Sequence, residues 1–129
     1  MDINLPDVKA EMEAAFARYE NALVNNDVAE LDALFWADPS TIRYGHGENL
    51  YGIDAIRAFR KARSPRGLER TLEKTVITTF GRDMAVASTL FHRPTMPGRV
   101  GRQMQTWMRT ADGWKVVAAH VSVIADPDE

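Results

Sequence analysis

The sequence predicts an α+β domain, in which three helices near the start pack on a curved, mainly antiparallel sheet. One observation is an apolar stripe whose members recur every three or four residues: Val8, Met12, Phe16, Tyr19 and Leu23. Another is a change of pattern after Glu69, where segments rich in Thr, Val and Ile alternate with short turns. Helices followed by neighbouring strands are typical of α+β folds, and a long helix across a curved sheet makes a cone that can hold a ligand.

Composition narrows the class of protein. The chain has 129 residues and is 45% hydrophobic, so we expect one domain over residues 1–129 with a proper core. It has no cysteine, which excludes disulfides and thiolate chemistry, and its formal net charge of -2 argues against a nucleic-acid partner. No long apolar run and no signal-peptide core is present, which predicts a cytoplasmic protein with no membrane partner.

The first two helices have recognisable ends. Asn4 is predicted to cap the first helix, and Asn25 to end it. Asp27 and Glu30 have the spacing of a capping box, which predicts a second helix that begins directly after Asp27.

A short strand, its returning partner and a third helix are expected next. Residues 41–45 are predicted to be the strand, and residues 50–51 pair with it across a glycine-rich turn. The third helix is predicted to begin near Asp54 and to end at Ser64. Its basic residues are expected to face solvent: Arg57, Arg60, Lys61 and Arg63. Four longer strands then complete the sheet, at residues 71–80, 84–93, 100–110 and 114–124.

Arg43 and Tyr19 are the first candidates for chemistry. Neighbours in a strand point to opposite faces, so Arg43 faces away from Ile42 and Tyr44. If it points into the cone, its planar fork can grip a carboxylate; the alternative is an arginine in water or paired with an acid. Tyr19 lies on the apolar stripe and is either a core residue or a proton donor whose phenolate a nearby cation stabilises.

The last two strands leave their orientation open. Gln103, Gln105 and Trp107 share one face of residues 100–110, opposite a more conventional core set of Met104, Thr106 and Met108. Gln105 and Trp107 therefore either line a polar pocket or form an oligomer interface. In the last strand one face carries Val116, Ala118, His120 and Ser122. His120 is a candidate base or ligand, although a histidine beside valines is more often structural.

Several kinds of site are absent from the sequence. The three histidines are scattered, and there is no H-x-H, H-E-x-x-H or cysteine pair, so we expect no metal. There is no P-loop, dinucleotide fingerprint or nucleophile elbow, so we expect no cofactor.

The chain resembles a known family over nearly its whole length. Its closing segment 113–122 (GWKVVAAHVS) is similar to the ending of nuclear transport factor 2-like proteins, which include the SnoaL-like group. Five further segments look like those of the AtzH-like group, also described as HpxZ oxalurate-catabolism proteins: RYE at 18–20, LFW at 34–36, RYG at 43–45, GENLYG at 47–52 and GRQMQTW at 101–107.

The resemblance implies a cone-shaped domain that pairs with a second copy through the outer face of the sheet. It implies a cytoplasmic, metal-independent hydrolase of carbon–nitrogen bonds, which converts 1,3-dicarboxyurea to allophanate by decarboxylation beside pathway amidases. A tyrosine of the first helix and an arginine of the first strand carry the reaction in the family, and they fall on Tyr19 and Arg43 here. His46 replaces an apolar residue expected in relatives, which leaves the substrate open.

The residues suit such a reaction. Arg43 would hold one carboxylate of a small anionic ureido substrate, Tyr19 would donate a proton to nitrogen, and Gln105 and Trp107 would hold and cover the urea plane. Two other classes of function stay open. One is a binding or accessory subunit of a partner amidase, and the other is a SnoaL-like isomerase or dehydratase that uses His120 or Asp83.

Overall fold

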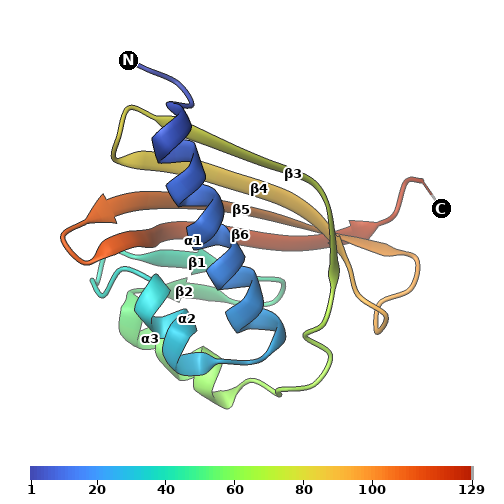
Figure 1. Ribbon diagram of the computed structural model, residues 1–129. Coiled ribbons are helices and arrows are strands. Elements are labelled where there is room, and N and C mark those ends of the chain that lie inside the picture. The colour runs from blue at the N-terminus through green and yellow to red at the C-terminus, as the bar shows by residue number, and fades with distance from the viewer. Residues whose placement is uncertain (129) are drawn as a thin grey trace.

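Three helices pack against one face of a six-stranded sheet (Figure 1). The computed structural model describes residues 1–128, so Glu129, the last residue of the expected domain, lies outside the described residues. The helices are α1 (Pro6–Val24), α2 (Val28–Leu34) and α3 (Ile53–Ala62). The strands are β1 (Ile42–Tyr44), β2 (Asn49–Tyr51), β3 (Thr71–Phe80), β4 (Met84–His92), β5 (Arg99–Thr110) and β6 (Gly113–Ala125). The predicted α+β class is confirmed.

The sheet places the first strand beside the last. Its order is β2-β1-β6-β5-β4-β3, and every neighbouring pair is antiparallel except β1 and β6, which run parallel. Arg43 consequently lies opposite Ala119 of β6. In Figure 1, α1 crosses the sheet diagonally, whereas α2 and α3 gather beside β1 and β2. No helix within residues 1–128 has the length and apolar character needed to cross a membrane.

Helix α1 buries the predicted stripe, but its start differs from the prediction. Leu5 occupies the N-cap position with Pro6 in the first turn, and no side chain caps the helix. Asn4 has a positive φ of 57°, and its side-chain oxygen instead accepts a 2.9 Å hydrogen bond from the backbone N–H of Thr79. Asn4 thus ties the N-terminal segment to β3. Asp27 caps α2 as predicted, because it accepts a hydrogen bond from the N–H of Glu30. The second half of the predicted capping box is absent, because the N–H of Asp27 donates to the backbone oxygen of Ala22 and the Glu30 carboxylate pairs with Arg18.

A β-bulge in β6 overturns the predicted alternation of the last strand. Thr106 lies opposite Ala118, but the next residue, Trp107, lies opposite Val116, so β6 carries one extra residue there. Val116 and Ala119 are both buried on the inner face. The prediction that Val116 shares a face with His120 is therefore wrong, because the bulge turns Ala118 and the residues after it by one position.

The inner face of β5 is the set with the glutamines. Gln103, Gln105 and Trp107 are at most 2% exposed, whereas Met104 is 56% exposed on the outer face. The face with Met104, which looked the more conventional core, points away from the helices. The core beneath α1 therefore contains amide groups that need hydrogen-bond partners.

Candidate functional site

A cavity of about 220 Å³ lies between the inner face of the sheet and the end of α3. Its wall combines apolar side chains with three arginines. The lining residues are Arg43, His46, Glu48, Phe59, Arg63, Leu68, Phe91, Arg93, Met96, Val121 and Val123. Ligand sites for drug-sized molecules are usually larger, so this volume favours a ligand of few atoms.

Arg43 lines this cavity and faces away from Ile42 and Tyr44, as the strand alternation predicted. Ile42 and Tyr44 line a groove on the opposite face of the sheet. The Nη1 of Arg43 donates a 2.8 Å hydrogen bond to Oε1 of Glu48, which follows the turn after β1. Gly45 leaves room for this contact, because a Cβ there would lie 1.7 Å from Oε1 of Glu48 and would push that side chain aside. The turn is therefore built to bring a carboxylate against Arg43, and part of the cation's charge is already offset.

Four more arginines lie near Arg43, and we call the five together the arginine cluster. Its members are Arg43, Arg60, Arg63, Arg70 and Arg93. Burial is the main cause that lowers the pKa of Arg60 and of Arg93, and like charges add to it: that of Arg43 acts on Arg60, and that of Arg70 on Arg93. Burying so many like charges together is costly unless anions compensate them.

Carboxylates compensate two further members. Arg60 is only 4% exposed and donates to Asp32 at 2.7 Å, so the prediction that it faces solvent is wrong. The Arg70 side chain is 1% exposed and forms a two-pronged pair with Glu20, at 2.9 and 2.6 Å. Arg70 also donates to the side-chain oxygen of Gln103 at 3.1 Å. These two arginines have structural partners that account for their burial.

Arg63 and Arg93 have no such partner among residues 1–128. Nε and Nη2 of Arg63 are buried and donate no hydrogen bond, and burial lowers the pKa of this guanidinium. Arg93 donates only to backbone oxygens, those of Gly67 and Leu68, at 2.9 and 2.6 Å. Burial, followed by the charges of Arg70 and Arg63, lowers the pKa of Arg93 to about 10. The cavity therefore holds two guanidinium groups that form no ion pair with a carboxylate of residues 1–128, although Glu48 and Glu20 act on Arg63 and Arg93 from a greater distance.

Tyr19 does not line this cavity, but it lies close to two arginines that do, Arg63 and Arg93. An ionised Tyr19 hydroxyl would raise the pKa of Arg60, Arg63 and Arg93, which puts it within electrostatic reach of all three. Its ring is 5% exposed and meets Trp107 edge-on, with centroids 6.3 Å apart. Its hydroxyl makes no hydrogen bond to any of the residues described, so it is free to meet a ligand or water.

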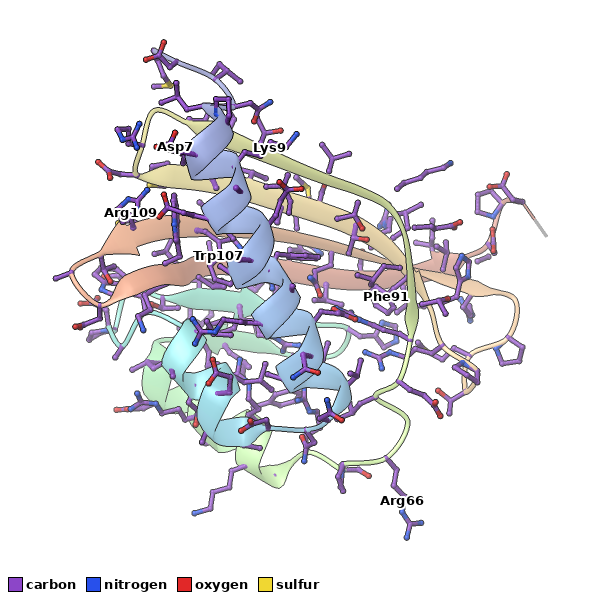
Figure 2. All side chains as sticks on the ribbon, viewed as in Figure 1. Asp7, Lys9, Arg66, Phe91, Trp107 and Arg109 are labelled. Carbon is purple, nitrogen blue, oxygen red and sulfur yellow. The ribbon has the colours of Figure 1, made fainter. Side chains whose placement is uncertain are left out.

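Trp107 packs against the ring of Tyr19, and Gln105 is hydrogen-bonded to Trp107. The indole N–H of Trp107 donates to the side-chain oxygen of Gln105 at 3.1 Å, and both residues are at most 1% exposed. In Figure 2, Trp107 lies behind α1. Neither residue lines the cavity of Arg43. Their contact with a substrate stays a prediction; in the structure Trp107 packs against Tyr19, and Gln105 is the hydrogen-bond partner of Trp107.

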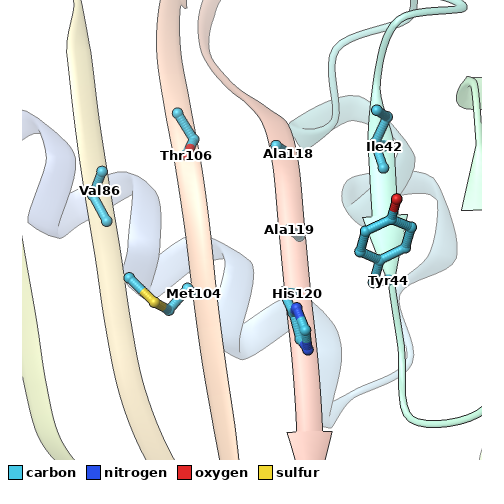
Figure 3. A pocket seen from close by; sticks show the side chains of 8 residues that line it. All are labelled: Ile42, Tyr44, Val86, Met104, Thr106, Ala118, Ala119 and His120. Carbon is cyan, nitrogen blue, oxygen red and sulfur yellow. The ribbon is translucent and has the colours of Figure 1, made fainter. Parts of the chain in front are cut away.

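His120 lies on the other side of the sheet. It lines an apolar groove of about 410 Å³ together with Tyr44 and Met104 (Figure 3). Its ring meets that of Tyr44 edge-on, with centroids 6.1 Å apart. The β6 bulge is responsible, because it turns the even-numbered residues after Val117 outward. The structure therefore separates His120 from the cavity that contains Arg43.

Sequence reasoning missed Arg63 and Arg93, although each carried a signal. Arg93 continues the inward series of β4, in which every second residue from Ala85 to Phe91 is buried. Arg63 follows Ile56 and Arg60 at helical spacings of four and three residues, on the buried side of α3. Both patterns place a cation on an inner face. The basic composition of the third helix had instead suggested that its arginines face solvent.

The cavity is equipped to recognise anions. Guanidinium groups bind carboxylates and phosphates through paired hydrogen bonds, and a nearby phenol can donate a proton. Among residues 1–128, no three or more His, Asp or Glu side chains come together as a metal site would require.

Comparison with known proteins identifies the family. The AtzH-like family model matches residues 1–127. This chain belongs to the AtzH-like family. A solved protein of unknown function from Pectobacterium atrosepticum is 60% identical over 96% of each chain, with a TM-score of 0.94. A cystatin-like fold protein from Burkholderia xenovorans is 53% identical over 98% of this chain and 99% of that one, also with a TM-score of 0.94.

A more distant structure confirms the superfamily. A nuclear transport factor 2-like protein from Salmonella enterica is 25% identical to this AtzH-like protein over 94% of each chain, with a TM-score of 0.75. No curated protein matches the chain. The resemblance of the sequence to the AtzH-like group, and the nuclear transport factor 2-like fold that it implied, are both confirmed.

Proposed function

We propose that this AtzH-like protein is a metal-independent decarboxylating amidohydrolase, which acts on a small N-carboxylated urea such as 1,3-dicarboxyurea. The observation that carries the proposal is that Arg63, which lines the cavity together with Arg43, lies within electrostatic reach of both Arg43 and Tyr19. A dianion of few atoms suits both the charge and the volume of about 220 Å³.

The reaction needs positioning and one proton. In the proposed step the bond between nitrogen and the carboxylate carbon breaks, and its electron pair stays on nitrogen. The carboxylate leaves as carbon dioxide, and nitrogen takes the proton of the Tyr19 hydroxyl, which gives allophanate. The neighbouring guanidinium groups stabilise the phenolate until water returns a proton. No strong nucleophile takes part in this step, and the chain has no cysteine that could supply one.

The test is carbon dioxide release from freshly prepared 1,3-dicarboxyurea, with spontaneous loss subtracted. We expect the wild type to accelerate release, and Tyr19→Phe to lower the rate at least about a hundredfold, the usual worth of acid–base catalysis. Arg43→Ala should also lower the rate, because the phenolate loses a stabilising cation. Arg66→Gln, at an exposed position outside the cavity, is the control. Full turnover by a folded Tyr19→Phe variant would contradict the assigned role. If the wild type does not exceed the blank, an accessory subunit of an amidase is the better interpretation.

We also propose that the outer face of the sheet pairs with a second copy of the chain. The groove of about 410 Å³ on this face is apolar, and Met104 and Tyr44 in it are 56% and 36% exposed. Exposed apolar patches of this kind often mark interfaces.

A further inference from the structure

We propose that Arg63 and Arg93 form a second anion subsite, distinct from Arg43, which holds the carboxylate that the substrate keeps. This inference rests on the proposed function for the identity of the substrate, but the subsite itself can be tested without turnover. Its consequence is selectivity: the protein should prefer a small dianion to a monoanion of the same size.

The arginines of the cluster differ in whether a carboxylate pairs with them, which supports different roles for them in the cavity. Glu48 offsets the charge of Arg43 at 2.8 Å, and two more carboxylates pair with Arg60 and Arg70. Among residues 1–128 no carboxylate pairs with Arg63 or Arg93, although both line the cavity. A buried cation without a counterion is unfavourable unless a ligand supplies the negative charge.

The geometry of the two groups also suits an anion. Arg93 is held in place, because its Nη1 donates to the backbone oxygens of Gly67 and Leu68 and its guanidinium lies 5.2 Å from the centre of the Phe91 ring. Arg63 has buried Nε and Nη2 atoms with no partner in the described chain. One guanidinium is thus fixed, and the other has two donors without a partner, which a rotation of the Arg63 side chain would turn toward a carboxylate.

The chemistry of decarboxylation decides which carboxylate goes where. The departing group becomes neutral carbon dioxide, so a strong interaction with its charge would stabilise the substrate more than the transition state. The retained carboxylate keeps its charge throughout, so strong binding there does not oppose the reaction. The fully charged pair, Arg63 and Arg93, therefore suits the retained end, and Arg43, whose charge Glu48 offsets, suits the departing end.

The experiment compares two unreactive probes of matched size by isothermal titration calorimetry. Glutarate has two carboxylates, and glutaramate has one carboxylate and one neutral amide. We expect the wild type to bind glutarate at least about tenfold more tightly, and Arg63→Gln and Arg93→Gln each to remove most of that preference while glutaramate affinity changes less than about twofold. Arg63→Lys should keep part of it, because the charge remains without the fork.

Arg66→Gln is the matched control, since Arg66 is exposed and extends away from the protein in Figure 2. Equal wild-type affinity for the two probes, no binding of either, or an equal loss for both in Arg63→Gln would each overturn the subsite. The wild-type comparison needs no variant, so a variant that fails to fold leaves the test valid.

Turnover separates this inference from the proposed function. Loss of a contact to the retained carboxylate should raise KM for 1,3-dicarboxyurea in Arg63→Gln with little change in kcat. A lowered kcat with unchanged KM would overturn the assignment of ends. If glutarate is preferred but no carbon dioxide is released above the blank, the subsite stands and the proposed reaction fails. If carbon dioxide is released above the blank but glutarate is not preferred to glutaramate, the proposed reaction stands and the subsite fails.

Discussion

Gly101 is the residue on which the shape of the cavity wall depends. The ring of Phe91 lies directly over it, and a Cβ at Gly101 would come within 2.1 Å of that ring. Arg70 and Arg93 in turn stack on the Phe91 ring, at 4.5 and 5.2 Å from its centre. Gly101→Ala should therefore displace Phe91 and cost about 1–3 kcal/mol of the free energy of unfolding, as overpacked cores do.

Urea unfolding of the Gly101→Ala variant measures this cost. Gly47→Ala is the control, because a Cβ at Gly47 meets nothing within 4 Å, and we expect it to change stability by less than about 0.5 kcal/mol. Equal stabilities of the two variants would mean that Phe91 can move without loss.

At this same scale the sequence predicted some residues well and others poorly. Strand alternation correctly placed Arg43 on the face opposite Ile42 and Tyr44 but did not say which face was inward, and the helical stripe predicted the burial of Tyr19. The burial of Arg60 could not be predicted, because it depends on Asp32 of a different helix, 28 positions earlier. Ion pairs between distant segments leave no local pattern in the chain.

The elements themselves were largely predictable. Strands β3 to β6 begin and end within one residue of the predicted ranges, since turns with Gly or Pro separate them. The bulge in β6 was not predictable, because it depends on how β5 pairs with β6 rather than on the residues of β6 alone. That single extra residue decided that His120 faces outward and that Ala119 faces the core.

His92 links three elements at one end of the sheet, and this link should depend on pH. Its ring lies 2.7 Å from Glu73 of β3 and 3.8 Å from Asp126, which follows β6. The hydrogen bond to Glu73 and the two carboxylate charges raise the pKa of His92 above its ordinary value of 6.5. A raised pKa in the folded state means that the stabilisation is fully present below the unfolded value and is lost as pH rises through the folded value.

We therefore expect His92→Gln to destabilise the protein more at about pH 6 than at about pH 9. Urea unfolding of both proteins at the two pH values measures the difference. In a Glu73→Gln background the pH-dependent part should largely vanish, because the main partner is gone. A His92→Gln effect that is the same at both pH values would show that the pair contributes nothing through its charge.

For the molecule as a whole, the sequence predicted the architecture, but it did not predict which face of the sheet packs against the helices and which face stays exposed. A meander of amphipathic strands has two plausible faces, and β5 carries large residues on both. The inner face received the glutamines because their amides meet Arg70 and Trp107, which are themselves buried. That choice left an apolar row on the outer face, where Tyr44, His120 and Met104 lie opposite one another on neighbouring strands.

This row is where the proposed pairing with a second copy can be tested. Met104→Lys places a charge at the centre of the groove and should convert a dimer to a monomer, because an unpaired lysine is costly to bury in an interface. Folding should survive, since Met104 is 56% exposed in the single chain. Size-exclusion chromatography with light scattering measures the mass, and circular dichroism checks the fold.

Ile3→Lys is the matched control, because Ile3 is 53% exposed but lies in the N-terminal segment outside the groove. We expect it to leave the dimer intact. The cavity with Arg43 opens on the inner face, so the Met104→Lys monomer should still bind glutarate like the wild type. A wild-type monomer, or a dimer that tolerates Met104→Lys, would contradict the pairing. Loss of glutarate binding in the Met104→Lys monomer would instead mean that the two faces of the sheet are coupled. The coupling would run through β6, the strand that carries His120 outward and Val121 inward.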